Sequence, residues 1–228
     1  MTGSSDSMTT HDLTGVLDVD ALGSVRTGST ILVSGPPMSN KDGLAMDVLA
    51  DGLERGQGAV VVTTGDHASD VVVDLRSRVD DLDETRVGVV DCRGEGDRST
   101  DRTEGGAFVQ HLASPSDMTG IGIGITKCME TLHNNGVDSG RFALVSLSTM
   151  LNYTDQKTVF KFCHVLSSRF DSQEYLGVFT IDAGAHDDQT LQVIKQAFDG
   201  MIEIREGESG YEARVLGITG QPTDWRPL

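Results

Sequence analysis

Two hydrophobic patterns alternate along this chain of 228 residues. Short continuous apolar runs are typical of strands buried on both faces of a parallel sheet. Segments with apolar residues every three or four positions are typical of helices packed against such a sheet. The continuous runs predict strands at residues 30–33, 59–63, 87–90, 142–147 and 176–181. The spaced pattern predicts one helix that begins at about residue 44 and four more at about residues 69–79, 116–134, 155–170 and 190–198. Because strands and helices alternate, we expect a mostly parallel sheet with right-handed crossovers.

The end of the chain follows a different pattern. Residues 201–205 and 211–215 alternate between apolar and polar side chains around a turn at residues 206–210 that contains only Gly, Glu and Ser. Such alternation about a turn predicts an antiparallel hairpin, here at one edge of the sheet. The predicted fold class is therefore α/β, with a mostly parallel central sheet and a C-terminal antiparallel hairpin.

Two polar segments lie outside these patterns. Residues 1–12 are predicted to be a disordered polar tail. Residues 93–106 follow a predicted strand and are predicted to form a long loop. The remaining chain, residues 13–228, is predicted to be a single domain, large enough to bury a core without disulfides or metal sites.

The chain is strongly acidic, with a net charge of −17 and lysine only at Lys41, Lys127, Lys157, Lys161 and Lys195. Nucleic acids are held by clustered Lys and Arg, so we expect no nucleic-acid partner. The charge is typical of a protein adapted to strong salt, because at roughly 1 M ionic strength the Debye length is only about 3 Å and self-repulsion is screened. We therefore expect unfolding in dilute buffer; an ordinary acidic cytosolic protein is the alternative.

The three cysteines, Cys92, Cys128 and Cys163, are far apart and form no C-x-x-C pair. This spacing predicts reduced, packed thiols in a cytoplasm and neither a disulfide framework nor a metal site. The start of the chain lacks the basic and apolar segments of an export signal. No apolar run approaches the roughly 18 residues of a membrane span, so we expect a cytoplasmic protein.

Ligands of parallel sheets bind at the carboxyl ends of the strands, and the most informative of these positions follows the first strand. The segment Gly35-Pro36-Pro37-Met38-Ser39-Asn40-Lys41-Asp42 has the spacing of the phosphate-binding motif G-x-x-x-x-G-K-[ST]. Lys41 takes the place of the phosphate-binding lysine. Asn40 replaces the second glycine, and Asp42 replaces the hydroxyl residue that holds Mg²⁺. These eight residues are the predicted nucleotide-binding segment.

Three segments resemble the RecA superfamily and, within it, the KaiC-like ATPase domains common in archaea. Residues 27–37 resemble the entry into a loop normally written G-P-P-G-S-G-K-[TS], residues 141–148 resemble a strand motif that normally ends in D-S-L-[ST], and residues 198–204 resemble the entry into the terminal hairpin. The resemblance extends over roughly residues 13–220 and, with the acidic composition, suggests the haloarchaeal type. It implies a RecA-like P-loop fold, a three-layer sandwich, with ATP or ADP as the ligand; relatives often form rings or filaments.

Several positions depart from the pattern of this family. Val145 stands where the family carries the aspartate that orients the metal ion. Gly65 takes the first place of an acidic pair, which leaves Asp66 as the candidate catalytic base. The terminal K-M-R run corresponds to Gly217-Ile218-Thr219, which has no cation. Because phosphoryl transfer depends on positioning and charge stabilisation, these losses together predict no useful turnover.

The loop itself allows two interpretations. Asn40 tolerates the left-handed backbone that the motif requires, and Lys41 together with the first amides of the next helix still offers an anion site. A carboxylate at Asp42, about 4 Å from a phosphate charge, would oppose binding by about 4 kcal/mol at an effective dielectric near 20. Alternatively, Asp42 only complements the helix dipole and Lys41 is a surface charge.

Three hypotheses about function follow. The first is a pseudo-ATPase that acts as a regulatory, signal-transduction or scaffold protein through a protein partner or self-association. The second is an active or slow Mg²⁺-dependent ATPase in which Asp42 holds the metal ion and Asp66 is the base. The third is a sensor that binds nucleotide without hydrolysis. The sequence leaves the role of Mg²⁺ open.

Other candidates have plainer explanations. The neighbours Cys163 and His164 point about 100° apart on a helix and are expected to be core and rim. The run His186-Asp187-Asp188 is expected to be a solvated loop, with a ligand or cation site as the alternative. Trp225 is either an exposed anchor for a partner or a lid over the edge of the domain.

Overall fold

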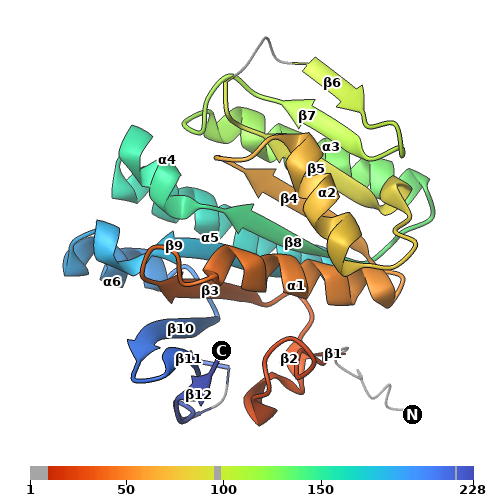
Figure 1. The fold of residues 1–228 in the computed structure, drawn as a ribbon. Helices are drawn as coiled ribbons and strands as arrows, with labels where there is room; N and C mark the ends of the chain where they lie inside the picture. The colour runs from red at the N-terminus through yellow and green to blue at the C-terminus, as the bar shows by residue number, and fades with distance from the viewer. Residues whose placement is uncertain (1–9, 95–98, 219) are drawn as a thin grey trace, which may run out of the picture.

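The computed structural model describes residues 10–94, 99–218 and 220–228, and Figure 1 shows their arrangement. A ten-stranded sheet lies at the centre, in the order β12-β11-β10-β3-β9-β8-β4-β5-β7-β6. All neighbours from β10 to β7 in this order are parallel, whereas β6, β11 and β12 pair antiparallel.

The sheet strands are β3 (Thr30–Gly35), β4 (Gly58–Thr63), β5 (Val87–Asp91), β6 (Ser99–Arg102), β7 (Phe108–His111), β8 (Gly140–Val145), β9 (Leu176–Asp182), β10 (Gly200–Gly207), β11 (Gly210–Leu216) and β12 (Arg226–Pro227). The helices are α1 (Lys41–Glu54), α2 (Ala68–Arg78), α3 (Met118–Asn134), α4 (Leu147–Tyr153), α5 (Gln156–Gln173) and α6 (Asp188–Lys195). Short 3₁₀ turns form at Asp20–Leu22, Glu84–Arg86 and Ala183–Ala185.

Helices cover both faces of the sheet and give three layers (Figure 1). α1 and α2 contribute to the core on one face, and α3 to α6 contribute to the core on the other. In β4, Val61 belongs to the first core, whereas its neighbours Val60 and Val62 belong to the second. Successive side chains of a strand point to opposite faces, so one β-branched run supplies both cores. The predicted α/β fold, with a mostly parallel sheet and a C-terminal antiparallel hairpin, is confirmed.

The structure corrects two local predictions. The strand predicted at residues 142–147 ends at Val145, because Oγ of Ser146 accepts a hydrogen bond from the N–H of Ser148 (3.1 Å) and caps the short helix α4. The loop predicted at residues 93–106 contains β6, which pairs with β7. All of β6 is exposed, so no apolar pattern marks it as a strand.

The predicted tail at residues 1–12 is only partly described, because residues 1–9 lie outside the described residues. Its last part is folded: Thr10–His11 form β1, which pairs antiparallel with β2 (Val25–Arg26). The side chain of His11 is buried. The folded part of the chain therefore includes Thr10 and His11, which were predicted to belong to the tail, while the assignment of residues 13–228 to a single domain stays a prediction.

Near His11, a buried ion pair joins β8 to α1. The guanidinium of Arg141 has no exposed surface, and its Nη2 lies 2.6 Å from Oδ2 of Asp51. Nη1 of Arg141 donates to the carbonyl of Val48 (2.7 Å), and Nε donates to Oε1 of Gln57 (3.0 Å). Buried charges are tolerated when they are paired and hydrogen-bonded, and Arg141 meets both conditions.

The buried His11 gives the first testable prediction. Burial lowers the pKa of His11 to about 4, and the neighbouring Arg141 guanidinium acts in the same direction. An unfolded histidine binds its proton near pH 6.5, so the free energy of unfolding is expected to fall as the pH drops from about 6.5 towards 4, and this contribution is complete above pH 6.5.

His11→Phe keeps a ring and removes the titrating group. Urea unfolding at constant KCl is expected to show a smaller loss of stability between about pH 7 and about pH 4.5 for this variant than for the unmodified chain. An equal loss in both proteins would contradict the prediction.

The cysteines are packed in the core, as predicted. Cys92, Cys128 and Cys163 are buried and unbridged. Burial raises the pKa of Cys92 and Cys163 to about 12 and also raises the pKa of Cys128. The thiolate is the reactive form of cysteine, so these thiols are inert packing groups in the folded chain at neutral pH.

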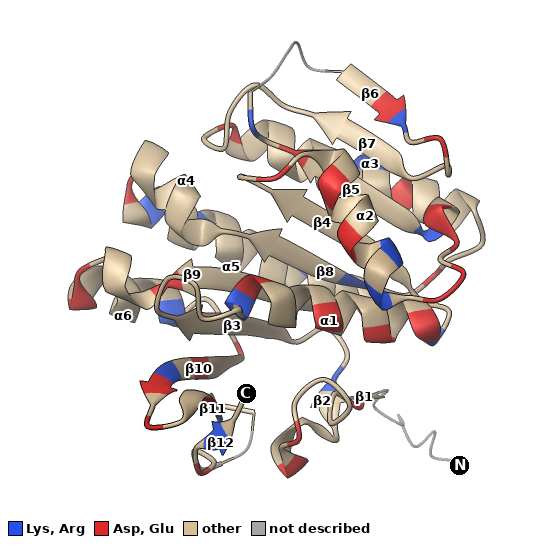
Figure 2. Cartoon of the chain, viewed as in Figure 1, with Lys and Arg blue, Asp and Glu red and all other residues tan. Residues whose placement is uncertain are grey.

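Acidic side chains outnumber basic ones on the helices and loops. Figure 2 shows Asp and Glu spread over α1, α2 and the loops, with fewer Lys and Arg between them. Arg78 of α2 is paired with both Asp74 and Asp47, so part of the basic charge is already neutralised. Across the described ranges, no helix combines the length and the apolar character that crossing a bilayer requires.

The hairpin of β10 and β11 extends the parallel sheet at one edge, where β12 pairs with β11. Trp225 lies against this hairpin, with the guanidinium carbons of Arg205 and Arg214 at 4.0 and 4.6 Å from its ring centroid. The two cations are held by Glu212 (2.8 Å) and Glu203 (2.7 Å). Of the two roles considered for Trp225, this geometry is that of a lid over the domain edge.

Candidate functional site

The carboxyl ends of β3, β9, β8 and β4 lie at one edge of the sheet, because these neighbouring strands are parallel. The predicted nucleotide-binding segment follows β3, and the candidate base Asp66 follows β4. Val145 ends β8, and Asp182 ends β9. The predicted site residues therefore lie together at the carboxyl ends of these parallel strands.

The loop after β3 contains two left-handed residues, neither of which is glycine. Met38 and Asn40 have φ angles of +63° and +58°. The side chain of Met38 is 90% exposed. The side chain of Asn40 lies against the first turn of α1, where a Cβ at Gly43 would collide with its Oδ1. The left-handed conformation costs roughly 1–2 kcal/mol at Met38 and less at Asn40, which tolerates it, so the loop holds this conformation at a free-energy cost.

Lys41, the predicted phosphate-binding residue, is buried in an ion pair. Its Nζ lies 2.6 Å from Oδ1 of Asp182, and its side chain is only 5% exposed. Nζ is also 3.4 Å from the carbonyl oxygen of Pro36, within the loop itself. The Asp182 carboxylate thus pairs with the ammonium group to which a phosphate would bind. Lys41 is not the free surface charge of the alternative interpretation.

Asp182 is held in this position from two sides. In the sheet register it pairs with Gly35, the first residue of the loop. Its N–H donates to Oγ of Ser148 (2.9 Å), and Nε2 of His186 lies 2.9 Å from the same oxygen. Ser148 is buried, so this contact ties the end of β9 to the first turn of α4.

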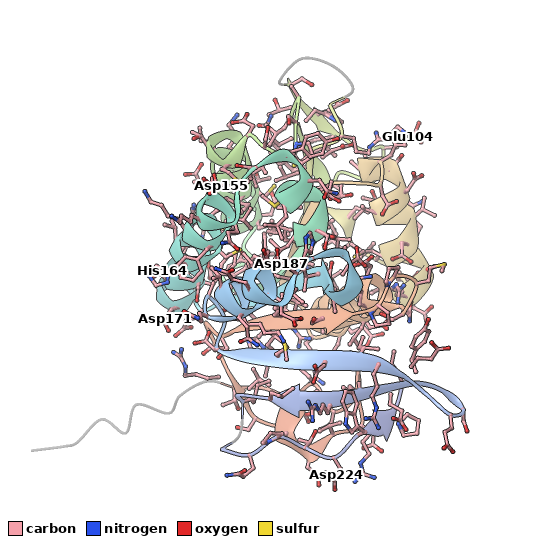
Figure 3. The ribbon with its side chains drawn as sticks, turned by 90° about the vertical axis from the view of Figure 1, so that its left-hand side faces the viewer. Glu104, Asp155, His164, Asp171, Asp187 and Asp224 are labelled. Carbon is pink, nitrogen blue, oxygen red and sulfur yellow. The ribbon has the colours of Figure 1, made fainter. Side chains whose placement is uncertain are left out.

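The run at residues 186–188 is therefore more than a solvated loop. His186 contacts Ser148, and Oδ1 of Asp187 accepts the N–H of Thr190 (2.7 Å) and caps α6. Hydrogen bonding with Thr190 lowers the pKa of Asp187. Asp187 is labelled in Figure 3 at this end of α6. The run shapes the segment that follows Asp182.

Val145 and Asp42 face a shared cavity. The carbonyl of Val145 accepts hydrogen bonds from the N–H and the Oγ1 of Thr64 (2.8 and 3.1 Å), and its side chain lines a cavity of about 350 Å³ between α1 and α2. Asp42 and Asp66 line the same cavity, and Oδ1 of Asp42 is buried without a hydrogen-bond partner.

These residues do not fit the magnesium site of the family motif. On the resemblance to the KaiC-like motifs, Asp42 would stand in the place of the hydroxyl that holds the metal ion, and Val145 would stand in the place of the aspartate that orients it. In the part of the chain that the structure describes, no group of three or more His, Cys, Asp or Glu side chains is placed to hold a metal ion.

Asp91 has a structural role that the sequence pattern did not reveal. Its buried carboxylate accepts the N–H of Ala68 (3.1 Å) and the N–H of Arg93 (3.1 Å). It thereby fixes the start of α2 and the turn after β5. A second cavity, of about 290 Å³, lies beside it and is lined also by His67 and His111.

The neighbours Cys163 and His164 do not line the site. Cys163 is buried in the core, whereas His164, labelled in Figure 3, lies at the surface of α5. This confirms the expected division into core and rim. Gly217 follows β11 with a φ of +80°, and Thr219 of the predicted terminal run lies outside the described residues.

Comparison with known proteins agrees with this architecture. No curated protein matches the chain. A KaiC-like protein from the hyperthermophilic archaeon Pyrococcus horikoshii has a similar structure, with a TM-score of 0.60 over 90% of this chain and 84% of that chain. Sequence identity is 15%, so this likeness supports the RecA-like P-loop fold alone.

A family profile extends over most of the chain and includes the loop, the ends of β4, β8 and β9, and the start of the hairpin. It matches residues 28–204. The chain therefore belongs to DUF7504, a family of unknown function.

Proposed function

We propose that this chain is a RecA/KaiC-like P-loop protein without ATPase activity, which acts in regulation or signal transduction as a scaffold for a protein partner or for further copies of itself. The ion pair between Lys41 and Asp182 carries this proposal, because it neutralises the cation that would bind the nucleotide phosphates. Any binding of ATP or ADP has to displace the Asp182 carboxylate first, so we expect it to be weak.

The residues around the ion pair support the absence of hydrolysis. Phosphoryl transfer relies on a metal ion that bridges the phosphates and on a residue that orients the attacking water. Val145 offers no oxygen to a metal shell, and Asp42 places negative charge where the motif has a neutral hydroxyl. Like charges about 4 Å apart repel by about 1 kcal/mol in water and by about 4 kcal/mol at an effective dielectric near 20.

The setting we infer is the cytoplasm of a haloarchaeon. The inert thiols suit a reducing compartment. The net charge of −17 is tolerable where salt screens self-repulsion. In this setting, functional assays need multimolar KCl to keep the chain folded.

The test is an ATPase assay with Mg²⁺ in about 3 M KCl, a concentration at which exposed charges are screened. The unmodified chain is expected to release phosphate no faster than Lys41→Ala. Equilibrium binding of ATP and ADP in the same buffer then separates two forms of the proposal: saturable binding that Lys41→Ala removes favours a sensor, and its absence favours a scaffold. Phosphate release above background that Lys41→Ala abolishes would contradict both forms.

A second candidate function is a slow ATPase in which Asp42 holds Mg²⁺ directly and Asp66 is the base. Its support is that Asp42 and Asp66 line one cavity next to the loop. It requires that Asp42→Asn lowers both Mg²⁺-dependent nucleotide binding and turnover, whereas Asp66→Asn lowers turnover alone.

A further inference from the structure

The cavity between α1 and α2 combines an apolar wall with an acidic rim. Its volume is about 350 Å³. Met46, Val61 and Val71 line it and are buried, and Val145 closes it at the end of β8. Polar groups line it as well, from the first turns of α1 and α2 and from the turn after β4. A ligand here would contact methylene groups on one side and carboxylates on the other.

Three carboxylates of this cavity form no ion pair among the described residues, although the Arg78 guanidinium, which Asp74 and Asp47 hold, also lines the cavity. Asp74, a fourth, is paired with Arg78 (3.1 Å). For Asp42, Asp66 and Asp70, the described residues supply no ion pair and no hydrogen bond to the carboxylate. Asp66 and Asp70 are exposed at the rim, whereas Oδ1 of Asp42 is buried and unpartnered. A buried acceptor without a partner costs roughly 1–3 kcal/mol, and more when it is charged, so a donor at this atom would be stabilising.

Helix dipoles explain only part of this arrangement. Asp42 and Asp70 lie in the first turns of α1 and α2, where negative charge stabilises a helix. Asp66 lies outside both helices, and a helix dipole requires neither an enclosed space nor an apolar wall. The arrangement as a whole is that of a binding site for a positively charged group.

The lining also restricts the chemistry of that group. A metal ion requires oxygen ligands on several sides, whereas one wall here is Met and Val. The volume suits a chain of several methylene groups with a cationic head, and each buried methylene contributes roughly 0.8 kcal/mol. We propose that this cavity binds an organic cation, a guanidinium or ammonium group on an aliphatic stem, supplied by an arginine or lysine side chain of a partner protein or by a polyamine. The proposal goes beyond the proposed function and holds whether or not nucleotide binds.

The experiment titrates the chain with four probes: agmatine, N-acetyl-arginine amide, spermidine and the stemless guanidinium ion. Binding is followed by calorimetry at the lowest KCl concentration that keeps the chain folded. Agmatine is expected to bind saturably and at least about tenfold more tightly than guanidinium, because agmatine buries a stem and carries a second positive charge. N-acetyl-arginine amide has a stem but the same single charge as guanidinium, so its gain over guanidinium measures the stem alone. Tighter binding of N-acetyl-arginine amide than of spermidine identifies a protein side chain as the source, and the reverse order identifies a polyamine.

Two variants test the site, and one controls for charge. The triple variant Asp42→Asn/Asp66→Asn/Asp70→Asn removes the carboxylates, and Val145→Met fills the cavity without changing charge. Each is expected to weaken agmatine binding by about tenfold or more. The control Asp20→Asn/Asp188→Asn/Asp224→Asn removes the same charge at exposed positions outside the cavity and is expected to bind as the unmodified chain does.

Several results would overturn the proposal. These are the absence of saturable agmatine binding up to about 10 mM, equal affinity for agmatine and guanidinium, and an equal loss in the control triple variant. A fourth is Mn²⁺ binding that depends on the three aspartates and that agmatine does not displace, because the site would then be a metal site. Thermal unfolding of each variant, compared with the control triple, shows that the loss of binding is not a loss of folding.

Discussion

Asp182→Asn is expected to increase the affinity of the chain for ADP by at least about tenfold. The Asp182 carboxylate lies 2.6 Å from Nζ of Lys41. This ion pair must break before a phosphate can bind to Lys41. Asparagine has nearly the same shape and keeps the backbone N–H that donates to Ser148. The substitution therefore frees the cation and removes a negative charge from the phosphate site, with little change to the end of β9.

The magnitude follows from the charges involved. Two unit charges 4 Å apart interact by about 1 kcal/mol in bulk water and by about 4 kcal/mol at an effective dielectric near 20. Multimolar salt screens exposed charges, but Lys41 is buried, so screening there is much weaker. A gain of about 1.4 kcal/mol, which is tenfold in affinity, is the low end of this range.

Equilibrium dialysis or calorimetry with ADP and pyrophosphate measures the effect. Asp188→Asn is the matched control, because it removes the same charge from an exposed position nearby and should leave affinity unchanged. In the double variant Lys41→Ala/Asp182→Asn the gain should disappear. If Asp182→Asn binds ADP no better than the unmodified chain, or if the gain survives Lys41→Ala, the ion pair does not control the loop.

Arg141→Met is expected to lower the free energy of unfolding by roughly 1–3 kcal/mol, since the carbonyl of Val48 is left without its buried donor and Asp51 keeps only Arg55 as a counter-charge. Asp51 would lose its buried counter-charge, and the carbonyl of Val48 would lose a donor. Methionine fills much of the volume of the arginine stem, so a cavity contributes little to the loss. Urea unfolding at constant KCl gives the difference.

Arg55→Met is the matched control for this second prediction. Arg55 pairs with the same Asp51 at 3.0 Å, but its side chain is 52% exposed. Exposed ion pairs contribute about 0–1 kcal/mol, so this variant should be nearly as stable as the unmodified chain. Adding Asp51→Asn to Arg141→Met should recover part of the loss. Equal effects of Arg141→Met and Arg55→Met would show that burial of the pair is not what stabilises the fold.

The sequence pattern predicted the main strands and helices because their buried side chains have to be apolar. A strand such as β4 is covered on both faces, so its composition alone identifies it. The pattern failed where burial does not control composition. β6 is an exposed edge strand, and α4 is only 7 residues long. Such short elements form because of local capping and pairing, which leave no periodic signal.

The site could be predicted only up to the strand ends. Each candidate follows a strand, and parallel pairing brings these positions to one edge. The ion pair required more, because Lys41 and Asp182 are far apart in sequence and meet only when β9 lies beside β3. Strand order in a parallel sheet depends on which crossovers pack best, and the apolar pattern does not encode that choice. The cavity also depends on how α1 and α2 are spaced.

Trp225 is a fluorescent probe of the edge of the sheet formed by β11 and β12. It is the chain's single tryptophan, so its emission reports on the C-terminal strand and the hairpin and on nothing else. Two guanidinium groups lie against the indole, and their withdrawal changes its surroundings. Fluorescence therefore follows the release of β12 from β11, while circular dichroism follows the helices. A difference between the two unfolding curves would measure how independently this border of the sheet opens.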